Sequence, residues 1–290
     1  MNQKSKKERL DSILVSKGLF ENKSQAQAAI MAGSVKVNGQ TTTKAGTQFP
    51  QDIKDIDVAV SPYVSRGGFK LEKAIKEFNI SAKDKICLDA GASTGGFTDC
   101  LLQNGAKKVY AVDVGYGQLA WKLRNDPRVI VIERTNIRNA APEEIYKDLE
   151  IPDNSLFAEL ITMDLSFISI IKVLENIKNL MNPEKQEIIA LIKPQFEAGK
   201  GLVPKSGVVK DKNIHVNVIK NIVEYACTLN VYPVDLTYSP IQGPAGNIEY
   251  LIYLTNKQNH LSEEKTRTVV DKAYEHFSSN QISGQQNYKP

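Results

Sequence analysis

The sequence predicts an α/β protein, in which a doubly wound, mostly parallel sheet follows a small N-terminal α+β domain. Two observations support this prediction. From residue 85 onward, apolar strand-like runs alternate with helical segments, which is the order of βα units that build a parallel sheet with helices on both faces. The first fifty residues instead have the pattern of two short helices and a hairpin, with eight Lys or Arg against three acidic residues.

Length and composition agree with two globular units. At 290 residues the chain exceeds a typical single domain, and 41% hydrophobic residues suffice for a core. The three cysteines are odd in number and lack metal-ligand spacing, so we expect free thiols and no metal. No run approaches the roughly 18 apolar residues of a membrane span, and the N-terminus lacks the apolar segment of a secretion signal. We therefore expect a cytoplasmic protein with no membrane partner.

Local signals place the elements of residues 1–60. Leu10, Ile13 and Leu14 have helical spacing before Gly18, a residue that commonly ends a helix. A second helix is expected from Ser24, its possible N-cap, to Ala32. Residues 34–37 then alternate like a strand, and the Asn-Gly pair at 38–39 is a strong signal for a hairpin turn.

After a linker at Ser61-Pro62, residues 61–256 are expected to form the α/β domain. A helix is expected at 262–277 within the final segment 257–290, followed by a polar, mobile tail. Seven runs are predicted as strands of the sheet: Ile86–Ala90, Val109–Val114, Val129–Ile132, Leu160–Asp164, Ile188–Ile192, Tyr232–Leu236 and Tyr250–Leu254.

The segment from Cys87 to Phe97 joins the first of these strands to a helix through a glycine-rich turn. Glycines let the backbone approach a ligand closely and leave N–H groups free at a helix N-terminus. A tight structural connection is the alternative. Asp113, at the end of the next strand, favours a ligand site, because an acid at this place can accept both hydroxyls of a ribose.

The turn does not have the spacing of a dinucleotide fingerprint. Asp89 at the strand end suits a cationic ligand better than a pyrophosphate, and Asp89-x-Gly91-x-x-x-Gly95 resembles the first motif of class I methyltransferases, a Rossmann-like family. The resemblance implies S-adenosylmethionine as cofactor. Asn136 falls where that family contacts adenine, although a loop cap is an equal alternative. The cofactor-binding residues implied are Asp89, Gly91, Ser93, Gly95, Gly96, Phe97, Asp113, Val114, Asn136 and Asp164.

Four charged residues mark the expected crevice at the carboxyl ends of the strands. Asp164 and Lys193 follow two strands, while Lys70 precedes the first strand and Glu249 opens the last. Singly, each could be a solvated surface charge. As an ordered set they resemble the Lys-Asp-Lys-Glu tetrad of FtsJ-type ribose 2′-O-methyltransferases. With the flanking Arg66-Gly67-Gly68-Phe69-Lys70 and Lys193-Pro194-Gln195-Phe196-Glu197, the chain resembles the TlyA family from about Lys7 to Leu254.

The chemistry of methyl transfer agrees with this tetrad. A ribose 2′-hydroxyl is a poor nucleophile, so a group must take its proton and hold it in line with the sulfonium methyl. A desolvated lysine near another cation can present a neutral amine, which makes Lys193 the expected base. Asp164 and Glu249 would orient that amine, and Lys70 would position the hydroxyl or a phosphate.

The N-terminal residues resemble the S4 RNA-binding domain, in Arg9-Leu10-Asp11, Lys23-Ser24-Gln25-Ala26 and residues 33–39. Arg9, Lys23, Lys36 and Arg66 are expected to face RNA, and a basic structural subdomain is the alternative. Resemblance to the TlyA family implies ribosomal RNA, or ribosomal subunits, as the partner and cytidine ribose as the target. Two other functions remain open, a membrane-active hemolysin and an RNA-binding protein with an inactive methyltransferase fold. The oligomeric state is not predicted.

Overall fold

The computed structural model describes residues 6–20, 22–31, 33–58, 61–149, 154–199 and 201–282. Within it the chain divides into two compact units, with the boundary between Arg66 and Gly67. The first unit is small and mixed α+β, and the second contains a seven-stranded sheet with helices on its faces. The predicted fold class is therefore confirmed.

The first unit packs two helices against short antiparallel strands. Its core contains Leu10, Ile13 and Leu14 of helix α1 together with Ala26 and Ile30 of α2. The elements are β1 (Lys7–Arg9), α1 (Leu10–Ser16), α2 (Lys23–Met31), β2 (Val35–Val37), β3 (Gln40–Thr41), β4 (Gln48–Pro50) and β5 (Ile56–Val58). Strand β1 pairs with β4, and β2 lies between β3 and β5.

Two local predictions for this unit have different outcomes. The Asn38-Gly39 turn is confirmed, because both residues have positive φ, 51° and 73°, between the paired strands β2 and β3. The proposed N-cap Ser24 is wrong, since α2 begins at Lys23 and the side chain of Asn22 accepts the N–H of Gln25 at 2.9 Å.

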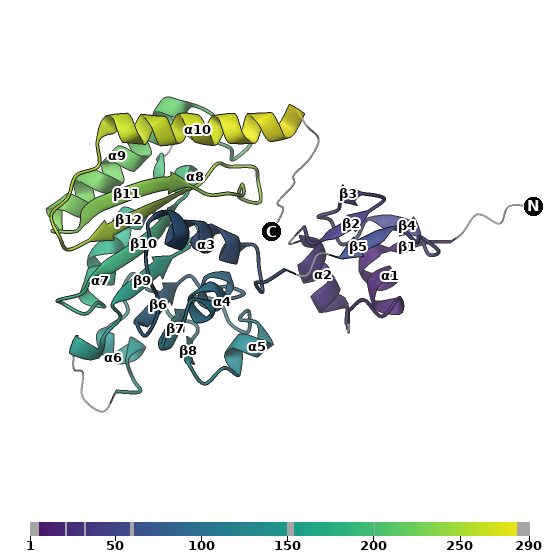
Figure 1. Cartoon of the computed structure of the whole chain (residues 1–290), viewed down its shortest axis with the longest axis horizontal. Coiled ribbons are helices and arrows are strands. Elements are labelled where there is room, and N and C mark those ends of the chain that lie inside the picture. The colour runs from purple at the N-terminus through teal and green to yellow at the C-terminus, as the bar shows by residue number, and fades with distance from the viewer. Residues whose placement is uncertain are drawn as a thin grey trace, which may run out of the picture. The chain divides into compact units, whose positions relative to one another are not determined.

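The sheet of the second unit has the order β11-β12-β10-β9-β6-β7-β8 (Figure 1). All neighbouring strands are parallel except β12, which runs antiparallel to both β10 and β11. The strands are β6 (Ile86–Ala90), β7 (Lys108–Val112), β8 (Val129–Ile132), β9 (Leu160–Met163), β10 (Glu187–Ile192), β11 (Tyr232–Tyr238) and β12 (Tyr250–Thr255). Each lies within two residues of its predicted bounds, because continuous apolar runs are what a sheet buried on both faces requires.

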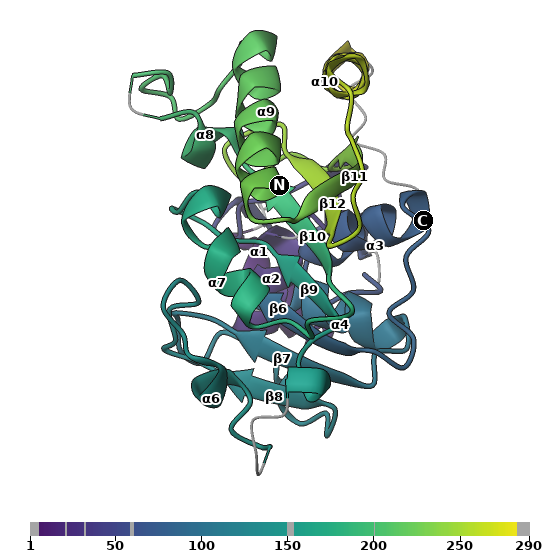
Figure 2. The same cartoon turned by 90° about the vertical axis from the view of Figure 1, so that its left-hand side faces the viewer.

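Helices cover both faces of this sheet. Figure 2 shows α6 (Pro142–Ile145), α7 (Leu174–Asn179) and α9 (Lys212–Thr228) on one face, with α3 (Gly67–Glu77) and α4 (Gly96–Gln103) on the other. The remaining helices are α5 (Trp121–Arg124), α8 (Pro194–Glu197), α10 (Glu263–Ile282) and the 3₁₀ helices η1 (Asn154–Leu156) and η2 (Ile170–Lys172).

Helix α10 contacts edge strand β11 and helix α9. It extends five residues beyond the predicted end at 277. The rest of the predicted mobile tail, residues 283–290, lies outside the described residues.

Candidate active site

The glycine-rich turn after β6 is closely packed against neighbouring elements. Gly91 and Gly95 have positive φ, 86° and 95°, which favour glycine. A Cβ on Gly91 would lie 2.7 Å from the carbonyl oxygen of Asp164, and one on Gly95 would lie 2.2 Å from Leu123. Helix α4 then begins at Gly96. Gly91 therefore allows the turn to lie against Asp164, the predicted catalytic carboxylate after β9, and Gly95 allows it to pack against α5.

Asp113 ties this turn to the end of β7. Its two carboxylate oxygens accept the N–H groups of Ser93, at 2.8 Å, and Gly115, at 2.7 Å. A carboxylate has about four acceptor positions, so the group retains capacity for two further donors, as a ribose diol would require. The next residue, Val114, is 68% exposed and offers an apolar surface beside the carboxylate. These features fit the nucleoside part of S-adenosylmethionine.

Asp89 does not line the site as expected. Its side chain is fully buried, and its carboxylate oxygens accept the hydroxyls of Thr98, at 2.7 Å, and Thr162, at 3.2 Å. Burial raises the pKa of Asp89 to about 7. The side chain lies within the sheet–helix core, so a direct contact with the cofactor is not what the structure shows. Asp89 instead joins β6 to α4 and β9 beneath the turn.

The remaining predicted cofactor residues have different surroundings. Phe97 is buried in α4, next to Gly96, and so supports the helix start. Asn136 is exposed, and its side-chain oxygen accepts the N–H of Arg138 at 3.1 Å. This hydrogen bond is a loop cap, the alternative role of Asn136, and the adenine contact stays a prediction.

The four charged residues of the predicted tetrad meet at one place. They come from α3, the residue after β9, the residue after β10 and the residue before β12. Lys70 Nζ lies 2.6 Å from Glu249 Oε2 and 3.9 Å from Asp164 Oδ2, and Lys193 Nζ lies 2.6 Å from Asp164 Oδ1. The side chains thus form a row of alternating charge, Glu249–Lys70–Asp164–Lys193. Each of the four residues therefore has an oppositely charged partner in the site, so none of them is the isolated surface charge that the sequence alone allowed.

Asp164 is the central carboxylate of the row. Burial alone would raise its pKa, but the positive charges of Lys70 and Lys193 outweigh this effect and lower the pKa of Asp164. The side chain keeps 21% exposure, compared with 1% for Glu249 and about a tenth for each lysine. Asp164 is therefore an anion at neutral pH and is the tetrad member most open to a ligand.

Two site residues were not predicted from the sequence. Ser166 accepts a hydrogen bond from Lys193 Nζ at 2.9 Å. Phe167, the next residue, is 90% exposed with a positive φ of 64°, and its ring centroid lies 5.1 Å from that of Phe196. The only signal in the sequence was their position directly after Asp164, since exposure and backbone angle depend on the folded loop.

Comparison with known proteins agrees with this geometry. Residues 63–256 match the FtsJ-like methyltransferase family, and residues 8–50 match the S4 domain. The chain is 40% identical to the 16S/23S rRNA (cytidine-2′-O)-methyltransferase TlyA of Mycobacterium tuberculosis, over 93% of this chain and 98% of the relative. The chain belongs to the TlyA family of FtsJ-like methyltransferases. S-adenosylmethionine is the cofactor of this class of domain.

Other similar proteins carry different names. A protein of Bacillus subtilis named putative rRNA methyltransferase YqxC is 47% identical, over 93% of this chain and 95% of the relative. A solved structure named putative hemolysin, from Streptococcus thermophilus, has a TM-score of 0.73 and 38% identity, over 95% of this chain and 98% of that one. Over the part of the chain that the structure describes, no helix is long and apolar enough to cross a membrane.

Proposed function

We propose that this protein transfers a methyl group from S-adenosylmethionine to the 2′-hydroxyl of a cytidine in ribosomal RNA, either free or in a ribosomal subunit. The observation that supports this most is the row Glu249–Lys70–Asp164–Lys193 beside the glycine-rich turn. The names of the relatives support ribosomal RNA and cytidine as the target.

The chain's own residues provide the base and its orientation. Lys193 Nζ has three substituent positions besides its carbon, and Asp164 and Ser166 occupy two of them. The third position is left for the acceptor hydroxyl; the proposed step requires that Lys193 first gives up its own proton, after which its amine takes the proton of the hydroxyl. Asp164 then stabilises the ammonium that results, and Lys70 holds Asp164 in place. When bound, S-adenosylmethionine would supply an electrophilic methyl group for the ribose oxygen.

The exposed ring of Phe167 supports an acceptor nucleotide that is unpaired at the site. A ribose 2′-oxygen inside a helix cannot easily reach a recessed amine, whereas enzymes acting on single nucleotides commonly stack the displaced base on an aromatic ring. Phe167 and Phe196 provide such a surface after β9 and β10, the strands that position Asp164 and Lys193.

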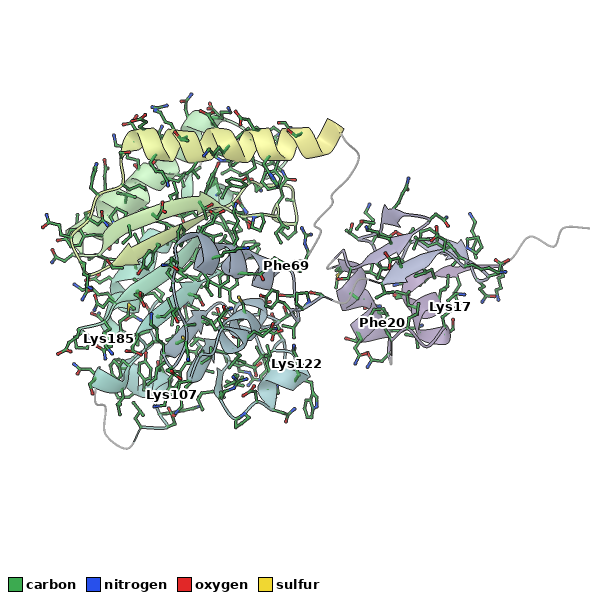
Figure 3. All side chains as sticks on the ribbon, in the orientation of Figure 1. Lys17, Phe20, Phe69, Lys107, Lys122 and Lys185 are labelled. Carbon is green, nitrogen blue, oxygen red and sulfur yellow. The ribbon has the colours of Figure 1, made fainter. Side chains whose placement is uncertain are left out.

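Replacing Lys193 by Ala tests the proposed base. We expect transfer of a radiolabelled methyl group to ribosomal RNA to fall by ~10²–10⁴ in rate, while cofactor affinity by calorimetry stays within a few-fold. Lys185→Ala is the matched control, because Lys185 is 69% exposed and lies on the far side of the unit from Phe69, the neighbour of Lys70 (Figure 3). Wild-type turnover by Lys193→Ala would remove Lys193 from the mechanism. A wild-type protein that labels no ribosomal RNA would reject the proposed function.

The basic residues of the first unit are proposed to hold the RNA. Lys23 is exposed and Lys36 half-buried, while Arg9 is half-exposed and bonds both carboxylate oxygens of Asp11, at 3.1 and 2.6 Å. Arg9 therefore orders the start of α1 as well as offering its outer N–H groups. Arg66, partly buried at the unit boundary, is proposed as a further contact.

Salt dependence measures these contacts in the full-length chain. Changing both Lys23 and Lys36 to Gln should reduce the log–log slope of RNA affinity against salt by about 1.5, at ~0.7–0.9 for each phosphate that is no longer neutralised. Lys107→Gln with Lys185→Gln is the control pair on the other unit (Figure 3). An unchanged slope in the first pair would assign the first unit a structural role instead.

A further inference from the structure

The loop from Leu165 to Ser169 connects β9 to η2 and carries two residues of the site. Ser166 bonds Lys193, and Phe167 presents its ring to solvent. A bulky residue with φ of 64° is strained, so contacts elsewhere in the loop must hold this conformation. The contacts at the far end of the loop therefore help to hold Ser166 and Phe167 in place at the site.

Glu197 makes those contacts. It is the last residue of α8, the short helix that directly follows Lys193. One carboxylate oxygen accepts the Ser169 hydroxyl at 2.6 Å, and the other accepts the backbone N–H of Ile170 at 2.8 Å. The side chain is partly buried, and burial raises the pKa of Glu197. The two oxygens thus hold the start of η2, one through its N-cap Ser169 and the other through its first residue, Ile170.

The loop is consequently fixed at both ends by a single five-residue segment, 193–197. Lys193 holds Ser166 near its start, and Glu197 holds Ser169 and Ile170 at its end. Because α8 is only one turn long, its two anchors lie close together in the chain, and their spacing helps to set where Phe167 and Ser166 lie. Movement of the end of the loop would shift both relative to the amine.

We propose that Glu197 is a positioning residue for the acceptor nucleotide, which it orders by anchoring the loop 165–169 against the segment that carries Lys193. The inference rests on the proposed function. Glu197 exchanges no proton with the substrate in this role, since both of its oxygens accept hydrogen bonds from the loop. It acts on the geometry of Ser166 and Phe167, which lie beyond Leu165, the loop residue next to the cofactor turn; we therefore expect the turn after β6 to keep its geometry.

Two variants of Glu197 and one of Ser169 test this role. Glu197→Ala removes both anchors, and we expect kcat for ribosomal RNA to fall by ~10²-fold, because misplacement by about 1 Å has effects of this size. Glu197→Gln should rescue kcat to within about three-fold, since its amide oxygen can accept from Ile170 and its NH₂ can donate to Ser169. Ser169→Ala removes one anchor and should give an intermediate kcat. Glu175→Ala, at an exposed position on α7, is the control.

The measurements separate positioning from a loss of folding. For Glu197→Ala and Ser169→Ala, where they fold, S-adenosylmethionine affinity by calorimetry and the thermal midpoint should remain near those of the wild type while kcat falls. Wild-type kcat in Glu197→Ala, or a parallel loss of kcat and cofactor affinity, would overturn the inference. If Glu197→Ala does not fold, Ser169→Ala decides in the same way. An inactive wild-type protein would instead reject the proposed function, so the two failures are distinguishable.

Discussion

Replacing Lys70 by Met should destabilise the catalytic unit more than any other single change in the tetrad. Lys70 is 9% exposed and faces two carboxylates, Glu249 at 2.6 Å and Asp164 at 3.9 Å. Glu249 is 1% exposed, and the loop at Gly243 is so close that an added Cβ would lie 2.5 Å from its carboxylate. Without Lys70 this buried charge has no counter-ion, which typically costs about 3–5 kcal/mol of unfolding free energy.

The size of the unit converts this cost into a temperature shift. For a domain of 150–250 residues, 1 kcal/mol moves the thermal midpoint by about 2–4 °C, so Lys70→Met should lower it by about 6–20 °C. Glu249→Gln should cost less, because Lys70 then still faces Asp164. The double variant Lys70→Met/Glu249→Gln should recover much of the stability that Lys70→Met removes while transferring no methyl group.

Differential scanning calorimetry at neutral pH, with labelled-methyl transfer as the second assay, measures both effects. A wild-type thermal midpoint in Lys70→Met would refute a stabilising role for Lys70. So would greater destabilisation in Glu249→Gln than in Lys70→Met, since only the loss of the shared cation leaves two anions facing each other.

Further changes test the rest of the site and the first unit. Asp113→Ala should weaken cofactor binding because the ribose hydrogen bonds are removed, and unchanged affinity by calorimetry would contradict the placement of the ribose. Gly91→Ala, whose Cβ would meet the Asp164 carbonyl, should abolish cofactor binding in the same assay; a bound cofactor would show that the turn can shift. Phe167→Ala should raise KM for ribosomal RNA by about ten-fold with cofactor affinity unchanged, as the removal of ~1–3 kcal/mol of base stacking implies. The Arg9 guanidinium holds the pKa of Asp11 at about 2. The free energy of unfolding of the first unit should therefore decrease as pH falls from about 4 towards 2, where Asp11 takes up a proton. Asp11→Asn should flatten that pH dependence, and an unchanged profile would remove the ion pair as its cause.

The sequence was most informative about elements whose signal is local. Buried strands such as Ile86–Ala90 are continuous apolar runs, and the Asn38-Gly39 turn depends on two adjacent backbones. The reversed direction of β12 was not predicted, because apolar patterning is the same for a parallel and an antiparallel strand buried on both faces. Its direction explains why Glu249, which precedes β12, lies beside residues that follow β9 and β10.

Residues of the site were predicted as a set, but one partner differs: Glu249, expected to orient the Lys193 amine, bonds Lys70 at 2.6 Å instead. That Lys70 pairs with Glu249 depends on two segments 179 residues apart in the chain. The misplacement of Asp89 has a similar cause, since its burial depends on hydroxyls supplied by Thr98 and Thr162 from other elements. Ser166 and the exposed Phe167 depend on a loop conformation that no residue pattern specified.

The position of β12 has a consequence for synthesis of the chain. Among the residues that the structure describes, β12 is the last strand in the sequence, yet it lies inside the sheet between β11 and β10, and the residue before it completes the charged row. Domains emerge from the ribosome from the N-terminus, and the first unit can fold while the catalytic unit is still growing. Throughout that time Lys70 lacks its buried counter-ion and β11 lacks its neighbour. A nascent chain would thus have a folded first unit before the charged row of the catalytic unit is complete.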